Sequence, residues 1–224
     1  MQIVVLCGGL GTRLRPLTEK VPKVMIPFFG KPFLEYVRRV FSAQGFRDFV
    51  LLVGYKGEQI EKYYGKTMVY SYDGKIPLGT GGALKKAKPL LVADEFVLVN
   101  GDTYLDMDYH DLIQEFHKSK KLAMMVVYKK RKKRNDVLVK NGLILRYDKK
   151  TRKKVNAVWV GIIIMKKDIL KLSPKKKSFS LECEIFPKLI KKKQLAAYLT
   201  KNKFYPIGRK EQIREFYDYF SNAI

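Results

Sequence analysis

Short apolar runs alternate with amphipathic segments through the first half of the chain. Three runs are rich in β-branched residues, have the length of a strand and stop at or near a glycine, as buried parallel strands do. They are QIVVL at 2–6, DFVLLVG at 48–54 and EFVLVNG at 95–101. The segments between them carry apolar residues at helical spacing. They predict helices at 33–45, 56–65 and 81–91.

This alternation predicts an α/β fold: a doubly wound, mostly parallel open sheet with helices on both faces. Ligands bind such sheets beyond the carboxyl ends of the strands. We therefore expect the loop after residue 6, Gly54 and the Gly101-Asp102 turn to lie along one rim of the sheet.

The second half of the chain has a different pattern. A strand is predicted at 122–128, and Asn141-Gly142 at the centre of 137–147 is a strong hairpin signal. A further strand is predicted at 157–165 and a closing helix at 213–224. No linker-like segment separates the halves, so we expect one domain over 1–224, in which the second half extends the same sheet.

Length and composition narrow the class of protein. A chain of 224 residues is long enough to bury the core of one large domain. Its two cysteines, Cys7 and Cys183, offer neither a disulfide framework nor metal-ligand spacing. No apolar run approaches the roughly 20 residues that span a bilayer. The first residues also lack the basic region of a signal peptide, so a cytoplasmic location is expected.

The formal net charge of +25 favours anionic partners. Much of this charge lies in lysine-rich runs such as KKRKKR at 129–134 and KKTRKK at 149–154. A solvated surface explains such runs most simply. Nucleic-acid binding is disfavoured, because the runs are not interleaved with aromatic residues.

The stretch CGGLGTRLRPLTEKVPK at 7–23 carries the candidate chemistry. It is not a dinucleotide fingerprint, since Leu14 stands where a third glycine is needed, and no Gly-Lys-Ser/Thr of a Walker loop follows. What remains is a glycine loop whose N–H groups can approach an anion, followed by Arg13 and Lys23. Arginine offers a planar fork for phosphate oxygens and lysine a compact charge. A tight turn with surface cations is the competing interpretation.

A longer set of motifs resembles the sugar-phosphate nucleotidylyltransferases. It comprises GGLGTRLRPLT at 8–18, PKVMIP at 22–27, GKP at 30–32, PLGTGGALKKA at 77–87 and NGDTY at 100–104. Within this family, the motifs most resemble those of the short heptose-1-phosphate and mannose-1-phosphate guanylyltransferase-like members. The resemblance implies a Rossmann-like nucleotidyltransferase fold without a C-terminal β-helix. It also implies a nucleotide-binding half at 1–128 and an acceptor half at 129–224, where the likeness is looser.

The resemblance implies an enzyme that joins a nucleoside triphosphate, with GTP as the inferred donor, to a sugar 1-phosphate and releases pyrophosphate. Arg13 would steady the pyrophosphate, Lys23 would bridge the α-phosphate and the sugar phosphate, and Asp102 would hold the cofactor Mg²⁺. Gly79 and its neighbours would contact the base. The implied substrate-binding residues are Leu6, Gly8, Gly9, Gly11, Thr12, Gly79, Thr80, Asn100 and Lys150.

Several acceptor positions depart from the family pattern. Asn135-Asp136 replaces a Tyr-Gly pair, which would present a carboxylate to the sugar, and Trp159 replaces an asparagine. A Glu-Lys pair falls on Lys149-Lys150, or on Asp148-Lys149 if one gap is allowed.

Pro206 stands where the family carries a second metal-binding aspartate, and proline has no side-chain ligand. Two alternatives follow: an active transferase whose metal is held by one carboxylate, phosphates and water, or a catalytically impaired nucleotide-binding subunit with a regulatory or structural role. A homodimer through the basic second half is a further expectation.

Overall fold

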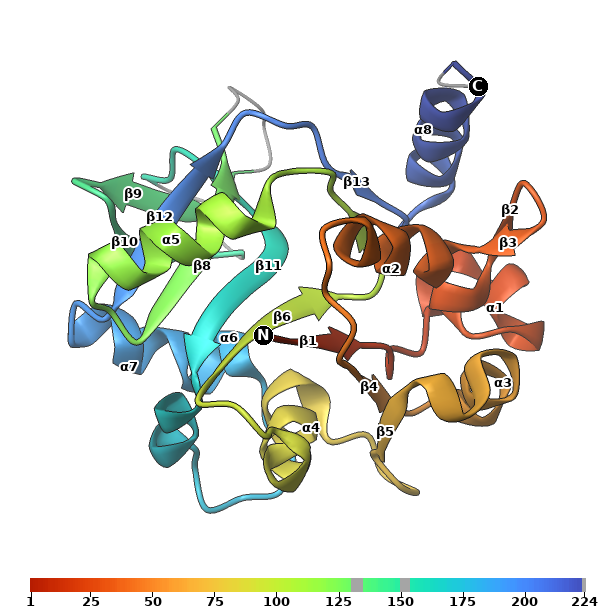
Figure 1. Ribbon diagram of the computed structural model, residues 1–224, viewed down its shortest axis with the longest axis horizontal. Coiled ribbons are helices and arrows are strands. Elements are labelled where there is room, and N and C mark those ends of the chain that lie inside the picture. Colours follow the sequence, from red (N-terminus) through yellow and green to blue (C-terminus); the bar gives the residue numbers. More distant parts are fainter. Residues whose placement is uncertain (130–134, 150–153, 223–224) are drawn as a thin grey trace.

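One nine-stranded sheet organises the protein (Figure 1). The computed structural model describes residues 1–129, 135–149 and 154–222. The strand order is β5-β4-β1-β6-β11-β8-β12-β10-β9. The strands of this sheet are β1 (Gln2–Leu6), β4 (Phe49–Val53), β5 (Val69–Tyr72), β6 (Glu95–Asn100), β8 (Ala123–Tyr128), β9 (Val137–Lys140), β10 (Leu143–Tyr147), β11 (Val158–Lys166) and β12 (Leu195–Thr200).

Seven of these nine strands point in the same direction. The block β5-β4-β1-β6 is parallel throughout, and β12 pairs parallel with β8. β11 runs antiparallel to both β6 and β8, and β10 runs antiparallel to β12 and β9. The predicted open, mostly parallel sheet is thus confirmed, with β11 and β10 as the reversed strands. The strands after residue 128 extend the sheet of the first half, as expected.

Helices cover both faces of the sheet, as the sequence predicts. Alternate strand residues explain why: Ile3 and Val5 of β1 face one apolar core, and Val4 between them faces the other. The first core includes residues of α2 (Phe33–Ala43), α3 (Gly57–Tyr64), α5 (Tyr109–Ser119) and α8 (Lys210–Ser221). The second includes residues of α4 (Gly79–Lys86), α6 (Leu181–Glu184) and α7 (Phe186–Lys191).

Smaller elements complete the described chain. They are α1 (Leu17–Lys20), the two-residue strands β2 (Pro27–Phe28), β3 (Lys31–Pro32), β7 (Thr103–Tyr104) and β13 (Tyr205–Pro206), and the 3-10 helices η1 (Thr12–Leu14), η2 (Lys23–Met25), η3 (Gly65–Thr67), η4 (Lys88–Leu90) and η5 (Lys167–Leu172). The two cysteines are unpaired, with Cys7 buried and Cys183 exposed.

The predicted hairpin forms with the expected turn chemistry. β9 and β10 pair antiparallel, and the two residues between them, Asn141 and Gly142, have φ angles of 49° and 72°. Two consecutive positive φ angles match a type I′ turn, which suits the twist of the flanking strands. The helices begin and end within a few residues of their predicted boundaries. The helix expected at 81–91, for example, begins earlier, at Gly79, and is followed after Lys86 by η4.

Candidate active site

The glycine loop leaves β1 and turns sharply at Gly11. This residue has a φ of 64°, and a Cβ atom there would lie 2.7 Å from Cγ2 of Thr18. Thr18 in turn donates its hydroxyl to the Gly11 carbonyl at 2.9 Å. Both the backbone angle and the close packing therefore require glycine at position 11.

The carboxyl ends of three neighbouring strands meet at this loop. The N–H of Gly101, after β6, donates to the carbonyl of Leu6 at the end of β1 (3.0 Å). A Cβ on Gly8 would lie 3.4 Å from the backbone nitrogen of Gly54, after β4. The predicted common rim, with the loop, Gly54 and the Gly101-Asp102 turn side by side, is thus confirmed.

Lys23 and Asp102 form an ion pair on this rim. Lys23 opens η2, and 12% of its side chain is exposed, compared with 31% for Asp102. The Asp102 carbonyl accepts the N–H of Ile207 at 2.9 Å, which fixes the turn that presents the carboxylate. A partly buried cation and anion are therefore held together where the strands end.

The guanidinium of Arg13 lies close to Lys23, with Gly208 next to both. A Cβ at this position would lie 3.6 Å from Nη2 of Arg13 and 3.8 Å from Nζ of Lys23. The cations of Arg13 and Lys23 thus flank a buried glycine that leaves room between them. Two positive groups next to a glycine loop suit a phosphate chain.

A cavity of about 330 Å³ opens between the glycine loop and α4. Most of the residues predicted to act on or bind substrate line it. These are Leu6, Gly8, Gly9, Lys23, Gly79, Thr80, Asn100 and Asp102. Gly11, Thr12 and Arg13 lie outside its lining, further along the same loop, and Lys150 falls outside the described residues.

The start of α4 packs tightly on a segment of the second half. Gly79 has a φ of 71°, and a Cβ there would lie 2.7 Å from the carbonyl oxygen of Phe179. The same oxygen accepts the N–H groups of Gly81 and Gly82 at 3.0 and 3.1 Å. The hydroxyl of Thr80 accepts the N–H of Leu181 at 2.9 Å. The glycines of PLGTGGA therefore allow this close approach, in addition to lining the cavity.

Two carboxylates line the cavity without having been predicted. Asp73 follows β5 and accepts the N–H of Leu78 at 3.2 Å. Burial raises the pKa of Asp73, against the opposing effects of that hydrogen bond and of Lys86. Glu182 accepts the hydroxyls of Thr80 (2.6 Å) and Ser180 (2.5 Å). Neither residue belongs to a sequence motif, and only the packing of the segment around Phe179 onto α4 brings Glu182 here.

In the acceptor half, the prediction for Asp136 is wrong. Asp136 does not present its carboxylate to a sugar: it is buried, lies outside the cavity lining, and accepts the N–H of Trp159 at 2.9 Å. Trp159 packs edge-on against Phe186 and Tyr147, and Nζ of Lys149 lies 5.3 Å from the centre of its ring. Trp159 and Asp136 thus support the sheet at the bulge in β11.

Pro206 lies next to Asp102, as the motif predicts. β13 pairs with β7, which sets Pro206 opposite Thr103, the residue after Asp102. Within residues 1–129, 135–149 and 154–222, no group of three or more His, Cys, Asp or Glu side chains could hold a metal ion. Asp102 thus has no second carboxylate opposite it at position 206. This suits Mg²⁺, which proteins commonly bind through one or two carboxylates together with substrate phosphates and water.

Comparison with known proteins identifies the family. The family model for nucleotidyl transferases matches residues 2–219. The D-glycero-α-D-manno-heptose 1-phosphate guanylyltransferase of Campylobacter jejuni is 34% identical over 222 residues, covering 96% of this chain and 98% of that protein. The enzyme of the same name from Aneurinibacillus thermoaerophilus is 30% identical over 223 residues, with 96% of each chain covered.

A solved structure agrees. HddC from Yersinia pseudotuberculosis, determined in complex with GMP-PN, superposes with a TM-score of 0.85 at 27% identity, covering 98% of this chain and 99% of that chain. The chain therefore belongs to the nucleotidyl transferase family. This confirms the sequence resemblance to sugar-phosphate nucleotidylyltransferases and the Rossmann-like fold that it implied.

Proposed function

We propose that this protein is a sugar-1-phosphate guanylyltransferase, which joins GTP to a sugar 1-phosphate and releases pyrophosphate. The observation that carries the proposal is the cavity between the glycine loop and α4, with the Lys23–Asp102 pair at its edge. The names of the two bacterial relatives support guanine as the base and a heptose 1-phosphate as the acceptor.

The proposed reaction needs positioning and charge neutralisation rather than a covalent intermediate. An oxygen of the sugar phosphate attacks the α-phosphorus, and the bond from that phosphorus to the β-phosphate oxygen breaks. N–H groups of Gly8 and Gly9 approach the triphosphate, while Gly11 and Thr12 shape the loop behind it. Lys23 contacts the reacting phosphate, and Arg13, next to Gly208, stabilises the departing pyrophosphate.

We assign Asp102 as the protein's ligand for Mg²⁺. A magnesium ion held there would neutralise phosphate charge on the nucleotide. Lys23 is paired with this carboxylate, so in this proposal the lysine and the metal ion bind the same phosphate group. Asn100, at the end of β6, and Thr80 line the cavity on either side of the proposed nucleotide.

The donor base is assigned through Asp73. Its carboxylate lies against the backbone of Gly8 and Gly54 and accepts the N–H of Leu78, directly before Gly79, the residue that the resemblance assigns to the base. Guanine carries two neighbouring donors, N1–H and the exocyclic amine, and a carboxylate is acceptor-only when ionised. We propose that Asp73 accepts both donors and so favours guanine over bases that lack this pair.

A pyrophosphate-release screen tests the function. The five common nucleoside triphosphates are combined with a set of sugar 1-phosphates, and Mg²⁺ and Mn²⁺ are run in parallel. We expect release with GTP and a manno-configured sugar 1-phosphate, and loss of at least 100-fold in Asp102→Ala. GTP binding without pyrophosphate release from any pair would instead favour the impaired binding subunit that Pro206 raises as the alternative.

The remaining expectations about partners are untested. No helix in the described part of the chain is long and apolar enough to span a bilayer. The cytoplasmic location, the homodimer and the absence of nucleic-acid binding stay predictions, and most of the KKRKKR run lies outside the described residues.

A further inference from the structure

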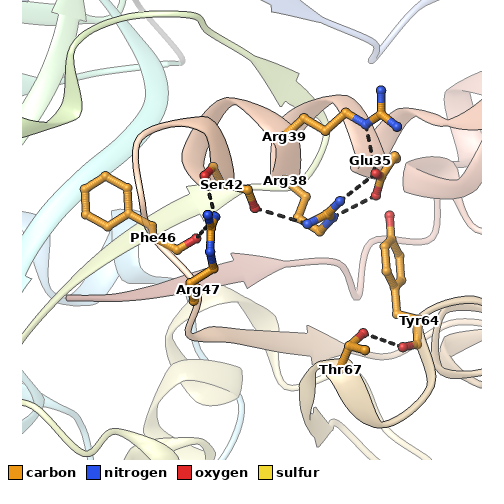
Figure 2. Close-up of polar contacts among 8 residues, drawn as sticks. All are labelled: Glu35, Arg38, Arg39, Ser42, Phe46, Arg47, Tyr64 and Thr67. Carbon is orange, nitrogen blue, oxygen red and sulfur yellow. Dashed lines mark hydrogen bonds and ion pairs between the residues drawn. The ribbon is translucent and has the colours of Figure 1, made fainter.

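A second cavity, of about 490 Å³, opens between α2 and the segment formed by α3 and η3 (Figure 2). We refer to it as the α2–α3 groove. Arg38 and Ser42 reach it from α2, Arg47 from the loop before β4, and Tyr63 and Tyr64 from the end of α3. Its volume lies within the range of about 300–1,000 Å³ that is typical of sites for small molecules.

The groove lies at the amino ends of the strands, whereas the candidate active site lies at their carboxyl ends. Its lining includes Phe49, the first residue of β4, and Met68, which directly precedes β5. The active-site residues Gly54 and Asp73 directly follow the last residues of the same two strands. Five residues of β4 at about 3.3 Å each separate the two places by roughly 16 Å. A ligand in the groove would therefore not share atoms with the proposed catalytic residues.

The groove carries a net positive charge. Glu35 is buried, and its carboxylate accepts two hydrogen bonds from Arg38 (2.8 and 2.7 Å) and one from Arg39 (3.0 Å). Burial alone would raise the pKa of Glu35, but the hydrogen bonds from the two arginines hold it below the usual range. Of these three side chains only Glu35 and Arg38 line the groove, and their charges cancel.

Arg47 gives the groove lining its excess positive charge. Its Nη1 donates to the carbonyls of Ser42 and Phe46, and it pairs with no carboxylate among the described residues. Arg38 also donates from Nη1 to the hydroxyl of Ser42, 3.1 Å away. The lining thus carries a net charge of about +1, and the guanidinium donors of Arg38 and Arg47 suit the several acceptor oxygens of a phosphomonoester.

A buried hydroxyl without a partner points into the same groove. Tyr64 is 8% exposed, and within the described part of the chain its hydroxyl has no hydrogen-bond partner. Figure 2 shows the ring directed toward Glu35 and Arg38. Burial is the main cause that raises the pKa of Tyr64, so the group keeps its proton and remains a donor. A buried donor that lacks an acceptor costs free energy, which an anionic ligand would remove.

We propose that the α2–α3 groove binds a small phosphorylated metabolite that also carries a planar or apolar group. The phosphate accepts hydrogen bonds from Tyr64 and Arg47 and lies in the field of Arg38. The rest of the molecule packs on Tyr63, whose side chain is 50% exposed, and on Met68.

Phenyl phosphate, titrated by isothermal calorimetry, tests the proposal. The titration uses the full chain with Arg13→Ala, which weakens anion binding at the glycine loop. Tyr64→Phe and Arg47→Gln should each weaken binding at least ten-fold. Tyr63→Phe, which keeps the ring, and Arg39→Gln, which removes an exposed charge outside the cavity lining, serve as matched controls and should change it less than two-fold. Inorganic phosphate should bind more weakly than phenyl phosphate, and phenol should give no heat.

Thermal melts separate a binding role from a structural one. Because the hydroxyl of Tyr64 has no partner, Tyr64→Phe should melt at the same temperature as the parent or above it. The proposal is overturned if phenyl phosphate does not bind the Arg13→Ala protein. It is equally overturned if Tyr64→Phe and Arg47→Gln bind phenyl phosphate as tightly as the controls do.

Discussion

Replacing Asp73 by asparagine tests how the protein selects its nucleotide. The substitution keeps the size of the side chain and one oxygen that can still accept the N–H of Leu78 at 3.2 Å. It replaces the other carboxylate oxygen by an NH₂ group, which is a donor. The donors of guanine would then meet one acceptor fewer and one competing donor.

The expected loss follows from the hydrogen bonds involved. A hydrogen bond to a charged group contributes about 1.5–3 kcal/mol. Asp73 is only partly buried, so solvent reduces the effect, and we expect a total loss of about 2–3 kcal/mol. At 1.36 kcal/mol per factor of ten, this is a roughly 30- to 150-fold drop in kcat/KM for GTP.

The assay compares GTP with ITP, whose base lacks the exocyclic amine. Wild-type protein should prefer GTP, and Asp73→Asn should lose most of that preference because the acceptor of the amine is gone. Asp94→Asn, an exposed position before β6, is the matched control and should leave the ratio unchanged. An unaltered GTP-to-ITP ratio in Asp73→Asn would refute the assignment of this carboxylate to the base.

The same carboxylate predicts a pH dependence. Burial raises the pKa of Asp73, so on acidification it gains a proton at a higher pH than an ordinary aspartate does. The preference for GTP over ITP should be complete well above this pKa and should fall as the pH drops through it. Asp73→Asn should show a flat ratio over the same range, measured as kcat/KM for both nucleotides.

Two further substitutions test the rim of the site. Gly161→Ala introduces a Cβ at a φ of 84° and only 2.8 Å from Nδ2 of Asn100, whereas Gly142→Ala has a similar φ of 72° with open space around it. Both should lose about 1–3 kcal/mol of stability through backbone strain, measured by urea unfolding, and only Gly161→Ala should also raise the KM for substrates by moving Asn100. Pro206→Asp adds a second carboxylate beside Asp102 and should lower the Mg²⁺ concentration needed for half-maximal activity; no change would show that position 206 does not face the metal.

Local pattern was sufficient for the nucleotide half of the fold. Runs such as 2–6 and 95–101 are strands because apolar residues at consecutive positions can be buried only inside a sheet covered on both faces. The antiparallel direction of β11 could not be predicted, because a run of apolar residues has the same pattern in a parallel and in an antiparallel strand. Helix α5 was also missed, although Asp108 accepts the N–H groups of His110 and Asp111 as an N-cap.

The candidate site divides in the same way. Gly8, Lys23 and Asp102 could be found because each belongs to a contiguous motif next to a strand end. Asp73 and Glu182 could not, because they reach the cavity only when β5 and the segment around Phe179 pack beside α4. The prediction for Asp136 was wrong for a related reason. Its carboxylate accepts the N–H of Trp159 at the bulge of β11, and no pattern in the sequence predicts that bulge.

Phosphorus NMR of a single reaction mixture tests the central claim most directly. Wild-type protein is incubated with GTP, Mg²⁺ and D-glycero-α-D-manno-heptose 1-phosphate or mannose 1-phosphate. We predict that the signals of a nucleotide-sugar diphosphate and of pyrophosphate rise together in equal amounts, and that neither rises with Asp102→Ala. GTP that binds yet stays intact with every sugar 1-phosphate offered would contradict the proposed transferase and assign the protein a binding role.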